Sequence, residues 1–336
     1  MTQVAEIKSP HEQRLEDNIA GKEDIYRESH KRVFKLLERF DGQKPAIDVE
    51  RALFFTQSMA ETVGQPLVLR WAKALMNVAK NITVMVQDDQ LLLGRCGGHD
   101  GRYGILYPEL DGDFLDIAVR DLPTRPQSPA SISPEDAKIV VEQIAPFWKG
   151  RTYHEALNKA LPAEVHKLTY DDPDGLISRF IVNETSSFRS SIQWVHDYEV
   201  VLKRGFNGLK QEMEEKLAAL DPASPVDQVD KRPFIEATIL VCDAIVLWAK
   251  RHADAARKAA EACADPVRKA ELIRMAENAE HVPANPARDF YEAVQSQYFT
   301  QMFSRLEQKT GTTISNGRMD PVLLSLLQEG PWKPAS

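Results

Sequence analysis

The stretch Val282-Pro-Ala-Asn-Pro-Ala-Arg-Asp-Phe-Tyr-Glu-Ala-Val-Gln-Ser296 marks the passage from one helical pattern to the next. Proline cannot continue a helix, so Pro283 and Pro286 predict a break before a helix over residues 287–309. The apolar spacing of the chain before this stretch predicts helices over residues 27–40, after Asp48, and over residues 67–80, 137–144, 175–220, 233–263 and 266–279. Helical patterns therefore dominate the sequence.

Two short apolar runs interrupt the helical pattern. Ile82-Thr-Val-Met-Val86 and Leu91-Leu-Leu93 flank the polar residues 87–90, and this arrangement is typical of two strands joined by a turn. The sequence therefore predicts a mainly α-helical chain with one small β-hairpin.

The composition excludes several classes of function. The chain has 336 residues, of which 43% are hydrophobic and 27% are charged, as in soluble globular proteins. A net charge of −8 gives no basic excess for binding nucleic acid. The three cysteines do not form a disulfide framework, and the sequence has no recognisable signal peptide or membrane-spanning stretch. We expect a cytoplasmic protein that binds neither nucleic acid nor membrane.

Common metal-binding and phosphate-binding motifs are missing from the sequence. Cys96 and His99 have the spacing of metal ligands, but a structural zinc site needs four ligands and no second Cys/His pair lies near them in sequence. The glycine-rich residues 94–104 lack the Gly-Lys-Ser/Thr ending of a phosphate-binding loop. We predict no metal site and no cofactor bound by this chain.

One pair of polar residues could bind an anion. Arg189 and Gln193 are four residues apart in the predicted helix 175–220, so their side chains would share one helix face. A guanidinium offers a planar fork of donors to carboxylate, phosphate or sulfonate oxygens, and the Gln amide adds a neutral donor. The alternative is a solvated surface pair, or an ion pair of Arg189 with Glu184 or Asp197.

Several short strings occur in a characteristic order. They are Glu50-Arg-Ala, Gly64-Gln-Pro, Arg70-Trp-Ala-Lys-Ala-Leu, Leu91-Leu-Leu-Gly, Tyr107-Pro-Glu, Ile144-Ala-Pro-Phe-Trp-Lys-Gly-Arg-Thr, the stretch 282–296 quoted above, and Ser315-Asn-Gly-Arg-Met-Asp. In order and spacing, these strings are similar to the N-terminal part of the glycyl radical enzymes, the pyruvate formate-lyase superfamily, over residues 25–320. The resemblance implies the N-terminal part of a ten-stranded α/β barrel.

Within this superfamily, Ser187-Phe-Arg-Ser-Ser-Ile-Gln-Trp194 resembles the sulfonate-binding segment of the lyases that cleave isethionate, with Arg189 and Gln193 at the sulfonate-binding positions. The resemblance implies a carbon–sulfur lyase that converts isethionate to acetaldehyde and sulfite during anaerobic organosulfonate degradation. It also implies a glycyl radical installed by a radical S-adenosylmethionine activase, a cysteine that carries the radical to the substrate, a nearby Glu and a homodimer. The cytoplasm, or a bacterial microcompartment within it, is the expected location.

The sequence departs from the family in its cysteines and in its last residues. None of its three cysteines precedes a Glu with the Cys-x-Glu spacing of the family. We therefore expect residues 1–320 to be the N-terminal part of the family domain, without the C-terminal half of the barrel and the glycine radical domain, and to be inactive alone. Residues 321–336 are expected to be an out-of-frame tail. A hypothetical DNA sequence can be written that encodes, after Asp320, the aromatic residues expected from the family. Inserting one C after the Asp320 codon shifts the reading frame, and the same DNA then encodes residues 321–336 of this chain.

Two alternatives stay open on the sequence. The chain could be part of another glycyl radical enzyme, such as a choline lyase, a diol dehydratase or a formate acetyltransferase, although a cationic or neutral substrate gives Arg189 little to bind. It could also be a non-enzymatic helical protein whose exposed apolar faces mediate association.

Overall fold

The structure, a computed structural model, describes residues 30–41, 44–99, 101–110, 112–126, 129–170, 194–307, 314–317 and 319. The chain divides into two compact units, residues 1–43 with 88–90 and residues 44–87 with 91–336. The described part of the first unit contains helix α3 (Lys31–Asp41), whose Lys35 Nζ lies 3.6 Å from Asp89 Oδ1. Helix α3 confirms the helix predicted over residues 27–40 within its described part.

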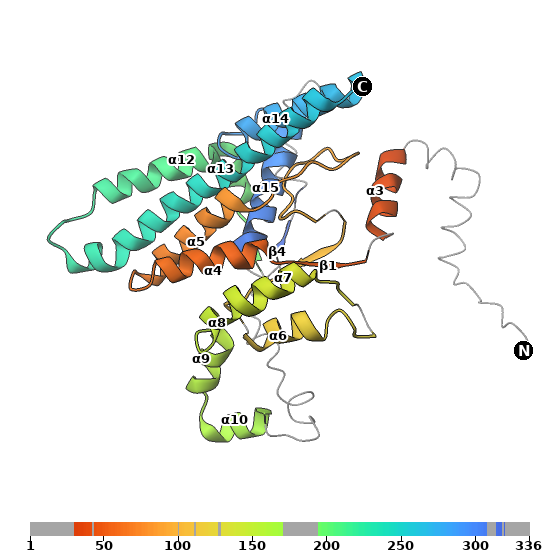
Figure 1. Ribbon diagram of the computed structural model, residues 1–336. Helices are drawn as coiled ribbons and strands as arrows, with labels where there is room; N and C mark the ends of the chain where they lie inside the picture. Colours follow the sequence, from red (N-terminus) through yellow and green to blue (C-terminus); the bar gives the residue numbers. More distant parts are fainter. Residues whose placement is uncertain are drawn as a thin grey trace, which may run out of the picture. The chain divides into compact units, whose positions relative to one another are not determined.

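The second unit is built mainly from helices. They are α4 (Glu50–Glu61), α5 (Leu67–Asn81), α6 (Gly112–Arg120), α7 (Pro134–Ile139), α8 (Ala145–Trp148), α9 (Tyr153–Ala160), α10 (Ala163–Tyr170), α12 (Tyr198–Ala218), α13 (Arg232–Ala262), α14 (Pro266–His281) and α15 (Phe290–Glu307), with the π-helical segments η1 (Val140–Ile144) and η3 (Val226–Lys231). Figure 1 shows α5, α12 and α14 packed along the long helix α13. None of the described helices has the length and apolar character needed to cross a membrane.

The core of this unit lies where α13 meets α5, α14 and α15. Small side chains of α13, among them Ala244, Ala249 and Ala256, are buried and allow the neighbouring helices to approach closely. Trp248 of α13 packs edge-on against Phe299 of α15, with 5.6 Å between the ring centroids. Helix α15, which follows the two prolines of the quoted stretch, therefore contributes aromatic bulk to the centre of the core.

Side-chain oxygens explain where two of the predicted helices begin. Ser133 Oγ accepts a hydrogen bond from Asp136 N at 3.0 Å, so Ser133 is the capping residue of α7. The helix predicted after Asp48 is α4, whose cap position is occupied by Val49. Asp48 Oδ1 still accepts a hydrogen bond from Glu50 N at 3.0 Å, so the carboxylate satisfies a donor at the start of α4.

Four short strands form two separate parallel pairs among the described residues. Strand β1 (Ala46–Asp48) pairs with β2 (Tyr103–Ile105), and β3 (Trp194–Val195) pairs with β4 (Ile314–Ser315). Parallel neighbours require long crossover connections, which helices provide here. The strands are therefore arranged as in an α/β protein and not as a hairpin.

The predicted β-hairpin is wrong, because the apolar runs at residues 82–86 and 91–93 form no strand. A side chain of α15 replaces the expected strand partner. Gln295 Oε1 accepts a hydrogen bond from Leu93 N at 2.9 Å, and Gln295 Nε2 donates one to Leu93 O at 2.7 Å. The apolar pattern correctly indicated burial, since Leu93 is fully buried, but this residue packs in a helical core.

Of the helix predicted over residues 175–220, the described residues include α12 from Tyr198 to Ala218. Residues 171–193 lie outside the described part, and Trp194–Val195 belongs to β3, so the helical prediction is wrong at these two residues. Within α12, Gly205 has a φ of 63° and interrupts the helical geometry. Glycine allows this break, since it adopts a positive φ without a steric penalty.

The break at Gly205 allows α12 to contact the backbone of the quoted proline stretch. Phe206 N donates a hydrogen bond to Pro283 O, and Asn207 N donates one to Ala284 O, both at 2.9 Å. A Cβ atom added at Gly205 would lie 2.3 Å from Ala284 O. Two independent constraints, the positive φ and the close backbone approach, therefore require glycine at this position.

The substitution Gly205→Ala is expected to lower the free energy of unfolding by about 1–3 kcal/mol, because it forces an L-residue into a strained backbone conformation against Ala284. Urea unfolding followed by circular dichroism measures the change. Gly208→Ala is the matched control, because Gly208 lies in the same helix and its nearest neighbour is the Arg204 side chain. An equal loss in both variants would contradict the argument.

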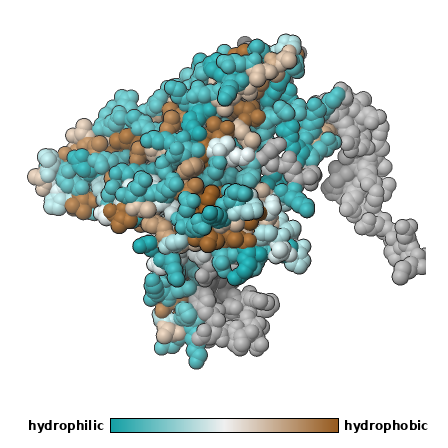
Figure 2. All heavy atoms as spheres, viewed as in Figure 1, coloured by the Kyte–Doolittle hydropathy of each residue, from teal (hydrophilic) through white to brown (hydrophobic). Residues whose placement is uncertain are grey.

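Apolar side chains are exposed between α5 and α13. Leu67, Val68 and Phe234 border a groove of about 700 Å³, and Leu67 and Phe234 are 62% and 60% exposed. Figure 2 shows hydrophobic residues on this helical part of the surface, among hydrophilic ones. Exposed apolar surface of this kind tends to associate with other apolar surfaces.

Candidate functional site

The two residues predicted to bind an anion, Arg189 and Gln193, lie outside the described residues. The description resumes directly after Gln193 with Trp194, which stands opposite Ile314 in the parallel pair β3–β4. The segment that carries the predicted site therefore leads into a β-strand. The helical spacing proposed for Arg189 and Gln193 stays a prediction.

Side-chain contacts fix the position of β3. His196, which follows the strand, has its Nε2 2.8 Å from Ser304 Oγ of α15. Because the Ser304 hydroxyl donates to Thr300 O at 2.8 Å, it accepts the hydrogen bond from His196 Nε2. Burial lowers the pKa of His196 and favours its neutral form. Tyr198 OH also donates to Asn316 Oδ1 at 3.4 Å, which links the start of α12 to the end of β4.

The glycine of the string Ser315-Asn-Gly-Arg packs against β3. Gly317 has a φ of 60°, and a Cβ atom there would lie 2.6 Å from Val195 Cγ1. A side chain at this position would push β3 and the residues after β4 apart. Glycine is therefore required by the packing of the two strand ends.

Arg51 and Glu109 form a buried ion pair that the sequence alone did not reveal. Arg51 is fully buried, and its Nη1 and Nη2 each lie 2.7 Å from one carboxylate oxygen of Glu109. Its Nε donates to Leu306 O at 2.8 Å, and its Nη2 donates to Glu307 O at 3.0 Å. The guanidinium also lies 4.1 Å from the centroid of the Phe55 ring. This charge-assisted pair joins α4, the loop after β2 and the end of α15.

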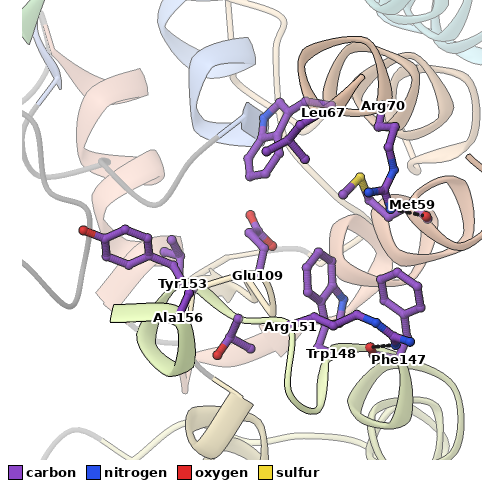
Figure 3. A pocket seen from close by; sticks show the side chains of 12 residues that line it. Met59, Leu67, Arg70, Glu109, Phe147, Trp148, Arg151, Tyr153 and Ala156 are labelled. Atoms are coloured by element: carbon purple, nitrogen blue, oxygen red, sulfur yellow. Dashed lines mark hydrogen bonds between the residues drawn. The ribbon is translucent and has the colours of Figure 1, made fainter. Parts of the chain in front are cut away.

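A cavity of about 420 Å³ is lined in part by Glu109 of this ion pair. Figure 3 shows the side chains that line the cavity. Its walls come from the end of α4, the start of α5, the loop after β2 and the region of α8 and α9. They are mostly apolar and include the aromatic side chains of Trp71, Phe147, Trp148 and Tyr153. A cavity of this size, with apolar walls and few polar groups, has the general character of a small-molecule site.

A second buried carboxyl group lies at the end of β1. Asp48 is only 1% exposed, and its Oδ2 lies 3.9 Å from His99 Nε2. Burial is the main cause that raises the pKa of Asp48 to about 6, and the negative charge of Glu50 raises it further. Asp48 therefore exchanges its proton at a pH well above that of an ordinary aspartate.

Cys96 and His99, which have metal-ligand spacing, contact different partners. The Cys96 thiol donates to Met302 O at 3.3 Å, and burial raises its pKa to about 12, whereas His99 faces Asp48. A thiol that stays protonated is a poor metal ligand. Within the described part of the chain, no group of three His, Cys, Asp or Glu residues is placed to hold a metal ion.

The family model described as pyruvate formate lyase-like matches residues 25–330, so the chain belongs to this family. The resemblance drawn from the short strings is thereby confirmed. Over 317 residues, the chain is 78% identical to the isethionate sulfite-lyase of Desulfovibrio desulfuricans, with 94% of this chain and 38% of the relative covered. The isethionate sulfite-lyase of Oleidesulfovibrio alaskensis is 70% identical over 312 residues, with 93% and 38% covered. The chain thus spans little more than a third of the length of these relatives.

Solved structures of glycyl radical enzymes are similar to this chain. The glycerol dehydratase of Clostridium butyricum has a TM-score of 0.81 at 26% identity, covering 91% of this chain and 37% of the other. A structure on 1,2-propanediol dehydration in Roseburia inulinivorans has a TM-score of 0.80 at 27% identity, covering 90% and 37%. These similarities confirm the predicted fold class. The domain boundary expected at residue 320 stays a prediction, because residues 320–336 lie outside the described part.

Proposed function

We propose that this chain is the N-terminal part of a glycyl radical lyase that cleaves the carbon–sulfur bond of isethionate, with acetaldehyde and sulfite as products. The observation that carries the proposal is the 78% identity to a relative named isethionate sulfite-lyase. By contrast, the trans-4-hydroxy-L-proline dehydratase of Clostridioides difficile is 29% identical, and the (2S)-3-sulfopropanediol dehydratase of Klebsiella oxytoca is 25% identical. This difference favours isethionate over the substrates of the dehydratases.

Arg189 and Gln193 are the residues proposed to bind the sulfonate group. The guanidinium of Arg189 can donate two parallel hydrogen bonds to sulfonate oxygens, and the Gln193 amide can donate one more. Gln193 directly precedes β3, whose end is held by the contact between His196 and Ser304. A fixed strand directly after Gln193 supports the proposal, because binding sites are most precise where rigid elements support them.

The proposed reaction also depends on groups outside this chain. A glycyl radical, installed by a radical S-adenosylmethionine activase, supplies the hydrogen-abstraction chemistry in such enzymes. In this chain, Cys96 and Cys242 are buried, and burial raises the pKa of both thiols. We infer that this chain contributes scaffold and sulfonate contacts, and that the reactive cysteine and glycine belong to the rest of a longer, homodimeric enzyme. A cytoplasmic or microcompartment location is part of the same proposal.

The test is a chimera in which residues 25–317 of this chain are joined in frame to the remaining part of the Desulfovibrio desulfuricans relative. After anaerobic activation, the chimera should release sulfite from isethionate. Arg189→Ala is expected to lower kcat/KM roughly 10- to 100-fold, because a charged hydrogen-bonding partner of the sulfonate is lost. Arg189→Lys should show a smaller loss, since it keeps the charge but loses the planar fork of donors.

Two controls accompany this experiment. Electron paramagnetic resonance shows whether each variant carries the glycyl radical, so that failed activation is not mistaken for lost binding. Arg120→Ala should leave turnover unchanged, because Arg120 is an exposed side chain paired with Asp116 and Asp121. Unchanged turnover in Arg189→Ala would refute the assigned site. Turnover of glycerol or (2S)-3-sulfopropanediol in place of isethionate would refute the assigned substrate.

A further inference from the structure

The cavity beside Glu109 has aromatic walls that are fixed without a ligand (Figure 3). Trp71 Nε1 donates to Glu307 Oε1 at 3.1 Å, and Trp148 Nε1 donates to Thr56 Oγ1 at 2.8 Å. Because both indole N–H groups are satisfied within the protein, the rings can offer the cavity apolar surface with no unmet polar group. Such preorganised aromatic walls lower the entropic cost of binding an aromatic or other bulky apolar group.

The charges around the cavity favour an anion. The carboxylate of Glu109 points toward the cavity, but its charge is compensated by the bidentate contact with Arg51. Two further guanidinium groups, those of Arg70 and Arg151, also line the cavity. Within the described part of the chain, neither of them forms an ion pair with an acidic side chain. The lining therefore carries a net positive charge.

Arg70 also has an unsatisfied donor at this site. Its Nη2 donates to Met59 O at 2.7 Å, but its Nε is buried and has no hydrogen-bond partner in the structure. A buried N–H group without an acceptor is unfavourable, and Arg70 is therefore incompletely satisfied in the structure. A ligand oxygen in the cavity can approach the charged guanidinium through its terminal Nη atoms. Arg151 donates to Phe147 O and lies over the Phe147 ring, so it is held at the cavity wall.

We propose that this cavity binds an organic anion with a bulky apolar body, namely an aromatic or alicyclic carboxylate or sulfonate. The apolar body lies against the walls formed by Trp71 and Trp148, and the anionic group accepts hydrogen bonds from Arg70 and Arg151. The cavity volume of about 420 Å³ suits a ligand of this class. Isethionate, with two carbon atoms, has no apolar body to fill such walls. The proposal does not depend on the reaction proposed above.

Isothermal titration calorimetry of the 336-residue chain tests the proposal with 2-naphthoate and its neutral counterpart 2-naphthol. We expect saturable binding of 2-naphthoate and at least roughly tenfold weaker binding of 2-naphthol, because only the former offers an anionic acceptor. Arg70→Met should weaken 2-naphthoate roughly tenfold or more and leave 2-naphthol unchanged. Equal binding of the two probes would overturn the proposal and indicate an apolar surface that packs against protein.

A pair of variants on α9 locates the bound probe and avoids reliance on the partly buried Arg70. Ala156 lines the cavity and is exposed, so Ala156→Phe should fill the cavity and abolish binding of 2-naphthoate without disturbing the core. Lys159→Phe is the control, because Lys159 is exposed on the same helix and does not line the cavity. Binding that survives Ala156→Phe, or an absence of binding in the unmodified chain, would refute the site.

Discussion

Replacing Arg51 by leucine is expected to lower the free energy of unfolding by about 3–5 kcal/mol, as observed when one member of a buried ion pair is removed. The substitution leaves the carboxylate of Glu109, which is 5% exposed, without its bidentate partner. It also removes the donors to the carbonyl groups of Leu306 and Glu307, and so loosens the end of α15 from α4. Urea unfolding of the purified chain, followed by circular dichroism, measures this loss.

The double variant Arg51→Leu/Glu109→Leu separates the cost of an unpaired charge from the cost of lost packing. It should be more stable than Arg51→Leu, because neither buried position then carries a charge. Arg120→Leu serves as the control for removing an exposed arginine that is paired with acidic neighbours, and no measurable change is expected there. A loss in Arg51→Leu no larger than that in the control would contradict the structural role of the pair.

His252 should make the folded chain sensitive to mild acid. Its ring lies in the core, 4.8 Å from the Trp248 ring and 5.9 Å from the Phe299 ring, measured between centroids. Burial is the main cause that lowers the pKa of His252 from 6.5 to about 3, and the charge of Arg251 contributes. Below pH 6.5 the unfolded chain binds a proton at this residue that the folded chain does not bind. The contribution of neutral His252 to stability is therefore lost as the pH falls from 6.5 to 3, by about 3 kcal/mol between pH 6.5 and 4.

The unfolding free energies of the wild type and His252→Leu, compared from pH 7 to pH 4, isolate this effect. Asp48 acts in the opposite direction, because its raised pKa means that the folded chain binds a proton before the unfolded chain does. The stability that Asp48 contributes is complete below pH 3.8 and is lost as the pH rises through about 6. Since Asp48 is present in both proteins, its effect cancels in the difference. The variant should gain about 3 kcal/mol relative to the wild type on acidification to pH 4, and parallel curves would contradict the prediction.

The helices were predictable because their signals are local in the sequence. Pro66 precedes α5, which was predicted over residues 67–80 and runs over Leu67–Asn81. The hydroxyl of Ser133 lies three residues from the donor that it caps. Apolar spacing and capping residues act over a few positions, so one sequence is enough to read them.

The structural roles of distant partners were not predictable in this way. Gln295 is 202 residues from Leu93, and nothing near Leu93 indicates that a side-chain amide takes the place of a strand. Arg51 and Glu109 both lie in strings that supported the family resemblance, but the resemblance did not reveal that they form one buried pair. Long-range pairing depends on the tertiary fold, which the local pattern does not contain.

The two candidate sites differ in how well they could be predicted from the sequence. For Arg189 and Gln193, spacing alone fits a solvated surface pair, and it is the family resemblance that favours a sulfonate site. The cavity lined by Arg70 could not be predicted from the sequence, because its walls come from segments between α4 and α9 that meet only in the folded chain. The first site therefore rests on relatives, and the second rests on geometry.

The contact between Gln295 and Leu93 also affects how copies of the chain meet one another. Leu91-Leu-Leu93 is a short apolar run, and an apolar segment with unpaired backbone groups can pair with a strand of another molecule. The amide of Gln295 occupies both the N–H and the C=O of Leu93, so a strand from another molecule cannot pair there. A polar side chain buried in α15 thus occupies the backbone groups of Leu93 that a strand of another molecule would otherwise pair with.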